Sequence, residues 1–236
     1  MNFFSDLSPG FFDDELLGEQ MRRISVFLDN KSQRGAIAAP SLPKHWQGYE
    51  DALTVRINEL MAEMQLRRIP TPDWMRLTDE SIVWPVLPEN SLREQYQVLA
   101  ERAEKGKLGR IRLPRSPHEL WASFKYSTLA RNHKAYLQFG KQVASRTIEF
   151  DSLLVQLTAV CRVKPAVGCL RNSLQHMWGY VSRHSSADPN RATLAELLAE
   201  VQRQAVDHQD TYLLNSTSLS ELAAWLPSIP EAQLKG

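Results

Sequence analysis

The stretch Leu170-Arg-Asn-Ser-Leu-Gln-His-Met-Trp-Gly-Tyr180 is the part of the chain that most clearly decides the fold. Apolar side chains recur along it and its flanks at steps of three and four, at Val167, Leu170, Leu174, Met177 and Val181. This spacing puts them on one stripe of a helix. The sequence therefore predicts a buried helix over 166–184, to whose core Trp178 also belongs.

The same period recurs along most of the chain, with turn residues between the periodic segments. It predicts helices at about 13–28, 48–66, 91–105, 116–130, 134–145, 148–163 and 191–207, and a short last helix. Three Ser–Glu pairs have the capping-box spacing that marks a helix start: Ser91/Glu94, Ser116/Glu119 and Ser218/Glu221. The run Ile82–Val86 has strand character, but its proline argues against a strand. The predicted fold class is all-α, a bundle of about nine helices that forms one unit or two packed helical subdomains.

Residues 70–90 divide the predicted helices into two groups. This segment is rich in proline and contains two tryptophans, which is typical of an extended crossing. The predicted organisation is a helical N-terminal region over 1–90, which ends in this crossing, and a helical domain over 91–236.

Composition excludes several classes of protein. No apolar run approaches the length of about 18 residues that a bilayer requires, and the N-terminus lacks the features of a signal peptide. We therefore expect a cytoplasmic protein with no membrane partner. Cys161 and Cys169 are too few for a disulfide framework, and their spacing is not that of a metal site. We find no phosphate loop, nucleophile elbow or dinucleotide fingerprint, and expect no metal and no cofactor.

Charge is distributed unevenly along the chain. The segment 105–184 carries fourteen Lys and Arg against three acidic residues, whereas the segments before and after it are acidic. A basic surface attracts nucleic acid through its phosphates, independently of sequence. The candidate phosphate-binding residues are Lys105, Lys107, Arg110, Arg112, Arg115, Lys125, Arg131, Lys134 and Arg171.

Five of these cations lie in the loop Lys105-Gly-Lys-Leu-Gly-Arg-Ile-Arg-Leu-Pro-Arg115, which contains no acid. Its two glycines would let the backbone approach a phosphate. A solvated linker between domains would have a similar composition. If the loop binds phosphate, replacing Arg110, Arg112 and Arg115 by alanine should weaken binding and its salt dependence.

Asn172, His176 and Tyr180 recur every four residues and form a second stripe on the 166–184 helix. They could contact a base edge, with the ring of Tyr180 stacking on an unpaired nucleotide. The interpretation that we favour from the sequence alone is a hydrogen-bonded polar seam inside the helical bundle, with His176 bonded to a neighbouring helix.

The second half of the chain resembles the YbgA-like family, a helical domain of bacteria. The resemblance covers about 116–232 and rests on three pieces: Phe124-Lys-Tyr-Ser-Thr-Leu-Ala-Arg-Asn-His-Lys-Ala-Tyr136, Gly140-Lys-Gln-Val-Ala144, and Lys164-Pro with Asn172-Ser-Leu-Gln-His-Met-Trp-Gly-Tyr180. Family members occur beside photolyase genes or fused to thiouracil desulfidase domains that act on thiolated tRNA. The resemblance thus implies a context of ultraviolet damage or thiolated RNA. The desulfidase cysteine cluster is not found here, so that activity is not implied.

The first eighty residues resemble, over shorter pieces, bacterial relatives of the pyrimidine-dimer DNA glycosylase/endonuclease. The pieces are Leu16-Leu-Gly-Glu-Gln-Met-Arg-Arg23 and His45-Trp-Gln-Gly-Tyr-Glu-Asp-Ala-Leu53. That family uses a free N-terminal amine and a glutamate on the first helix. Here Asn2 follows Met1, which favours retention of the methionine, and Arg22 or Arg23 stands where the glutamate is expected.

The leading functional prediction is a nucleic-acid-binding helical protein that uses the basic belt over 105–184, with DNA or RNA as its partner. One alternative is an interaction module that binds an acidic protein partner or forms a homo-oligomer. A second alternative is a pyrimidine-dimer-type glycosylase/lyase. No catalytic residue follows from the sequence.

Overall fold

The structure is a computed structural model that describes residues 6–32, 42–73 and 82–228. Over these ranges it contains ten α-helices, four 3-10 helices and no strand. The predicted all-α class is confirmed. No helix among the described residues is long and apolar enough to cross a membrane.

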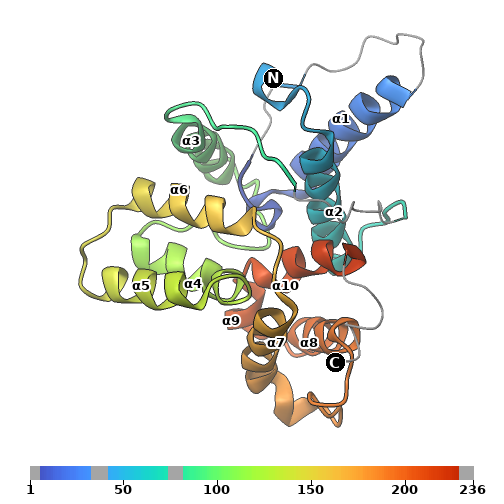
Figure 1. The fold of residues 1–236 in the computed structure, drawn as a ribbon, viewed down its shortest axis with the longest axis vertical. Coiled ribbons are helices and arrows are strands. Elements are labelled where there is room, and N and C mark those ends of the chain that lie inside the picture. Colours follow the sequence, from blue (N-terminus) through green and yellow to red (C-terminus); the bar gives the residue numbers. More distant parts are fainter. Residues whose placement is uncertain (1–5, 33–41, 74–81, 229–236) are drawn as a thin grey trace.

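Figure 1 shows the arrangement of the helices. The α-helices are α1 (Asp14–Ser32), α2 (Glu50–Leu66), α3 (Ser91–Glu104), α4 (Pro117–Leu129), α5 (His133–Ala144), α6 (Phe150–Cys161), α7 (Val167–Val181), α8 (Leu194–Asp207), α9 (Thr211–Leu214) and α10 (Ser218–Glu221). The 3-10 helices are η1 (Pro9–Phe11), η2 (Lys44–Trp46), η3 (Ser182–His184) and η4 (Leu222–Ser228).

The predicted buried helix is α7, which η3 extends to His184. Four residues of its apolar stripe are buried, with Leu170, Leu174 and Met177 at 0% exposure and Val181 at 1%, and Val167 at its start is partly buried. Trp178 is also buried, as predicted. The periodic spacing of apolar residues thus located both the helix and the face that it buries.

Only one of the three predicted capping boxes is formed even in part. Ser116 accepts a hydrogen bond from the Glu119 backbone N–H at 3.2 Å and starts α4. The other two are wrong. Asn90 caps α3 in the left-handed conformation (φ 62°), so Ser91 already lies inside the helix. Ser218 does not cap α10, because it is the first residue of the helix and Thr217 occupies the N-cap position. The Glu221 carboxylate binds Arg131 instead.

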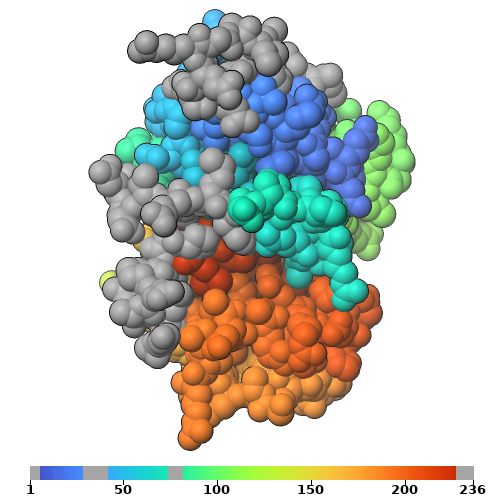
Figure 2. All heavy atoms as spheres, turned by 90° about the vertical axis from the view of Figure 1, so that its right-hand side faces the viewer, coloured from blue at the N-terminus to red at the C-terminus, as the bar shows by residue number. Residues whose placement is uncertain are grey.

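Two large apolar cores hold the helices together, and a small third cluster of Val55, Ala224 and Trp225 joins α2 to η4. The larger core joins the N-terminal arm (residues 6–12), α1 and α2 to α3, α4 and α6. The smaller core joins α4 to α7, α8, α9 and α10. α10 lies at the centre of the molecule, in contact with α2, α4 and α8 (Figure 1). In the space-filling view α2 rests directly on the C-terminal helices (Figure 2).

The crossing after α2 forms neither strand nor helix where the structure describes it, at 70–73 and 82–90. Trp84 packs edge-on against the buried Trp46, with ring centroids 6.1 Å apart. Arg162, the residue that follows α6, donates to the Pro85 carbonyl at 2.9 Å. The crossing therefore fastens the N-terminal region to the C-terminal end of α6.

Candidate nucleic-acid interface

The middle of the 105–115 loop is anchored to the N-terminal arm. The Ile111 N–H donates to the Gly10 carbonyl at 2.9 Å, and the Ile111 side chain is 1% exposed. A Cβ placed on Gly109 would lie 2.4 Å from the Phe11 carbonyl carbon, so this glycine permits close backbone packing. Gly106, with φ +77°, makes the turn that ends α3. Gly109 therefore packs against the arm, Gly106 makes a turn, and the loop is bound to the arm at Ile111.

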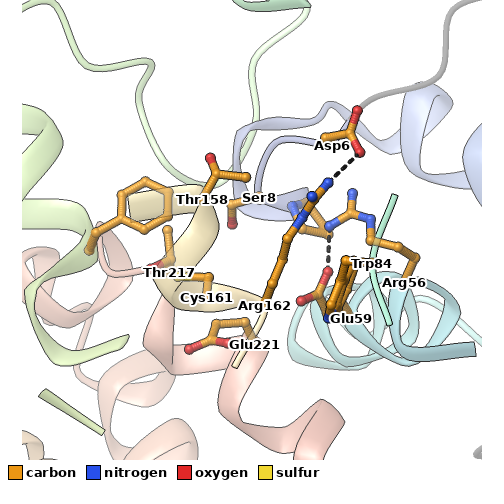
Figure 3. Close-up of a pocket in the computed structure, with 12 residues that line it drawn as sticks. Asp6, Ser8, Arg56, Glu59, Trp84, Thr158, Cys161, Arg162, Thr217 and Glu221 are labelled. Carbon is orange, nitrogen blue, oxygen red and sulfur yellow. Dashed lines mark hydrogen bonds and ion pairs between the residues drawn. The ribbon is translucent and has the colours of Figure 1, made fainter. Parts of the chain in front are cut away.

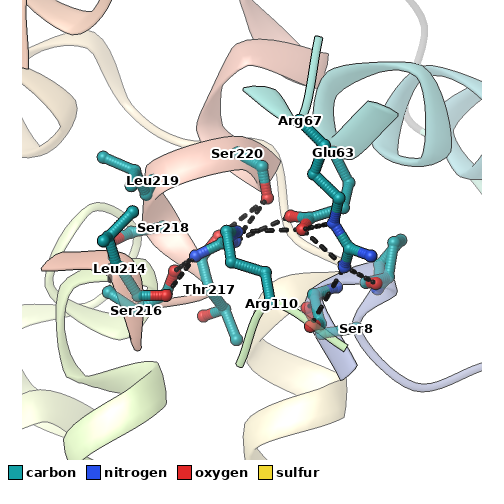
Figure 4. A network of polar contacts seen from close by, with 12 residues as sticks. Ser8, Glu63, Arg67, Arg110, Leu214, Ser216, Thr217, Ser218, Leu219 and Ser220 are labelled. Carbon is teal, nitrogen blue, oxygen red and sulfur yellow. Dashed lines mark hydrogen bonds and ion pairs between the residues drawn. The ribbon is translucent and has the colours of Figure 1, made fainter. Parts of the chain in front are cut away.

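The side chain of Arg110 points from this loop into the protein, where it binds the fully buried Glu63 of α2 (Figure 4). Its Nε and a terminal nitrogen donate to the two carboxylate oxygens of Glu63 at 2.9 and 2.7 Å. The other terminal nitrogen donates to the carbonyls of Leu214 and Ser216. Arg67 donates to the same carboxylate at 2.8 Å. Arg110 is therefore not a surface cation, and we remove it from the predicted phosphate-binding set.

The two arginines determine the protonation of Glu63. Burial alone would raise the pKa of this carboxyl, but the charges and hydrogen bonds of Arg110 and Arg67 outweigh burial and lower the pKa to about 2. Glu63 is consequently an anion at neutral pH. The basic loop and the acidic N-terminal half thus neutralise each other in the interior at this point.

Three more of the predicted cations are engaged within the protein. The Arg131 side chain is 0% exposed and binds both carboxylate oxygens of Glu221 at 3.0 and 2.8 Å. Arg171 donates to the carbonyls of Pro189 and Ala192, at 3.4 and 3.1 Å. Lys107 stays half-exposed and forms an ion pair with Glu15. Arg131 therefore also leaves the predicted set, because no solvent-facing donor remains on it.

The other predicted cations remain on the surface. Lys105, Arg112, Arg115 and Lys134 are exposed and form no ion pair with any residue that the structure describes. Arg112 lines a groove of about 360 Å³ together with Tyr212 and Asn215. Arg112 and Arg115 also border a larger groove beside α3. Grooves of this size accept small organic groups.

An aromatic cluster stands at the edge of the first groove. The rings of Tyr180 on α7 and Tyr212 on α9 stack with centroids 4.5 Å apart and planes 14° apart. The Lys125 ammonium of α4 lies 4.5 Å from the Tyr212 ring centroid and 4.8 Å from that of Tyr126. Tyr126 donates to the Tyr180 hydroxyl at 3.3 Å and stacks against His176. Three helices, α4, α7 and α9, thus bring rings and a cation to one place.

Burial shapes the chemistry of this cluster. Burial lowers the pKa of Lys125. It also raises the pKa of Tyr126, and the hydrogen bond to Tyr180 adds to that shift. The cluster therefore presents a lysine whose hydration is reduced, which strengthens its cation–π contacts with the rings of Tyr126 and Tyr212.

The stripe of Asn172, His176 and Tyr180 faces outward. Asn172 and His176 are exposed, and Tyr180 is 39% exposed. The favoured interpretation of a buried polar seam is therefore wrong, because α7 uses its apolar stripe for the core and leaves this one to solvent. Tyr212, which completes the cluster, was missed because α9 is a single turn with no sequence period.

No group of three or more His, Cys, Asp or Glu side chains with the arrangement of a metal site occurs within residues 6–32, 42–73 and 82–228. In the region that resembles the glycosylase, Arg23 is buried and forms an ion pair with Glu19 at 3.0 Å. Asn2, on which that reading also depended, lies outside the described residues.

Residues 125–221 match the model of one protein family, described as "Protein of unknown function (DUF1722)". The match begins at Lys125 and ends at Glu221, so it contains the whole aromatic cluster and both partners of the Arg131–Glu221 pair. No curated protein and no solved structure matches the chain.

Proposed function

We propose that this chain is a YbgA-like protein that binds an unpaired strand of nucleic acid across the tyrosine cluster and the groove beside it. The observation that carries this proposal is the stacked pair Tyr180–Tyr212, with Lys125 over one ring and Arg112 in the adjoining groove. The family match over 125–221 supports the YbgA-like assignment, since YbgA-like proteins carry this domain.

Exposed rings and unpaired cations suit the two parts of a nucleotide. Bases of any sequence stack on aromatic side chains, at about 1–3 kcal/mol per base. Arg112 and Arg115 supply charge for the phosphates that link the bases. A duplex hides the faces of its bases, so we propose that unpaired segments are preferred. The genomic context of YbgA-like families supports ultraviolet-damaged DNA or thiolated tRNA as the physiological setting.

The test is fluorescence anisotropy of the full chain with a labelled single-stranded DNA, the matching RNA, a duplex and a tRNA, over a range of salt. The double variant Arg112→Ala/Arg115→Ala should bind more weakly. The slope of log affinity against log salt should become shallower by about 1.4, since each phosphate contact on a single strand contributes about 0.7. The double variant Arg68→Ala/Arg203→Ala removes the same charge from another groove, between α2 and α8, and should change little.

The aromatic contribution is tested separately. Tyr180→Ala should weaken binding of the single strand by about tenfold, the loss of one stacked base. Tyr180→Phe keeps the ring and should bind like the unaltered protein. Equal binding by all four variants would contradict the proposal. If no nucleic acid binds at low salt, the surface instead serves an acidic protein partner or a second copy of the chain.

A further inference from the structure

A small cavity lies where the N-terminal arm, α2, the segment at Trp84, α6 and α10 meet (Figure 3). Its volume is about 30 Å³. A single water needs roughly 10–15 Å³ on this measure. The cavity therefore has room for a group of about two or three non-hydrogen atoms. It is separate from the tyrosine cluster, and none of its walls is formed by the residues proposed above to bind nucleic acid.

Ion pairs form most of the polar wall. Asp6 of the arm binds Arg162 at 3.1 Å, and Glu59 binds Arg56 one turn away on α2. Glu221 also lines the cavity and forms an ion pair with Arg131, which is not part of the cavity wall. Each acid has its own arginine. The surroundings of the cavity are thus close to neutral when all three carboxyls are ionised.

Several polar groups on the wall have capacity for a further hydrogen bond. One carboxylate oxygen of Glu59 accepts from Arg56, and the other has no donor among the described residues. The Thr158 hydroxyl and the Cys161 thiol, on α6, likewise have no partner there. Arg162 has five N–H donors, of which two are used, on Pro85 and Asp6. Unused hydrogen-bond donors on the wall therefore outnumber unused acceptors. The cavity suits a group rich in oxygen atoms, which accept hydrogen bonds.

We propose that this cavity binds the carboxylate group, with its three non-hydrogen atoms, of a small monocarboxylic acid such as formate or acetate, and that Glu59 takes up a proton as the acid binds. Arg162, Thr158 and the protonated Glu59 would donate to the two carboxylate oxygens. Once Glu59 is protonated, the three ion pairs retain three positive charges and two negative charges: Arg56, Arg131 and Arg162 against Asp6 and Glu221. The bound anion restores the charge balance.

The environment of Glu59 supports this coupling. Burial raises its pKa, and burial outweighs the opposing charge of Arg56; repulsion from Glu221 adds to the rise. Arg131 acts in the opposite direction. At the C-terminal end of α6, Arg162 carries a positive charge. The Cys161 thiol beside it is uncharged, since burial raises the pKa of this thiol. The remaining charged group on the wall, Asp6, is neutralised by Arg162.

Isothermal titration calorimetry of the full chain with formate and with acetate tests the proposal, from pH 5 to pH 8 in two buffers of different ionisation enthalpy. We expect binding with uptake of up to one proton, and an affinity that falls by up to about tenfold per pH unit as Glu59 deprotonates. Glu59→Gln mimics the protonated carboxyl. This variant should bind acetate with no proton uptake and little dependence on pH.

A second variant keeps the test informative if Glu59→Gln fails to fold. Thr158→Val removes one hydroxyl at constant shape and should weaken acetate binding by about tenfold. Glu101→Gln, on the exposed face of α3, serves as the control and should have no effect. The proposal is overturned if the folded protein binds neither acid, if both variants bind as the unaltered protein does, or if neutral acetamide binds as well as acetate. None of these outcomes bears on nucleic-acid binding, which uses other residues.

Discussion

The ionisation of Glu63 should make an identifiable contribution to the stability of this protein. Its pKa is lowered from 4.5 to about 2 in the folded chain by Arg110 and Arg67, against the effect of burial. A carboxyl whose pKa is lowered by folding stabilises the fold at pH values above the unfolded pKa. This stabilisation is lost as the pH falls towards the folded pKa. At about 1.4 kcal/mol per pKa unit, the contribution at neutral pH is about 3 kcal/mol, of which about 2 kcal/mol disappears between pH 5 and pH 3.

Urea unfolding of the unaltered protein and of Glu63→Gln, at pH 5 and at pH 3, measures this contribution. Glutamine cannot ionise, so the gap in unfolding free energy between the two proteins should narrow by about 2 kcal/mol at the lower pH. Taking the difference cancels the titration of the other carboxyls. Glu101→Gln on the surface of α3 should show a small gap that is the same at both pH values. A gap for Glu63→Gln that stays constant from pH 5 to pH 3 would refute the ion-pair account of this site.

Two further pairs of variants separate structural from surface roles in the 105–115 loop and in α7. Arg110→Ala leaves the Glu63 carboxylate buried with one arginine instead of two, and should lower the unfolding free energy by about 3 kcal/mol or more in urea titrations, whereas the exposed Arg112→Ala should change it by less than about 0.5 kcal/mol. Equal effects of the two would show that Arg110 is not the buried member of the pair. Gly109→Ala should destabilise by about 1–3 kcal/mol, because its methyl group meets the Phe11 backbone. Gly179→Ala, in α7 with nothing within 4 Å, should raise the unfolding free energy by up to about 1 kcal/mol through helix propensity.

The helices could be predicted because their signals are local. A step of three and four in apolar residues specifies both the helix and its buried face, as α7 shows with Leu170, Leu174 and Met177. Helix starts were predicted less well. Glu221 has the spacing of a capping residue, but in the fold it serves Arg131 instead. A buried charge demands a partner more strongly than a helix end demands a cap.

The candidate surface could be predicted only in part. The local charge pattern correctly indicated that 105–115 is basic, and Arg112 and Arg115 do lie on the surface. It could not indicate which cations the interior would take, because the partners are distant in sequence. Glu63 lies 47 residues before Arg110, and Glu221 lies 90 residues after Arg131.

By itself, then, the sequence determined an all-helical chain, the buried stripe of its organising helix and the uneven distribution of its charge, since each depends on residues a few positions apart. The tertiary structure decided which charges remain on the surface, which tyrosines meet, and that the N-terminal arm closes a cavity against α6 and α10. These features arise when segments far apart in the chain pack together. Pairing and burial then fix the electrostatic state of each group, which no local pattern encodes.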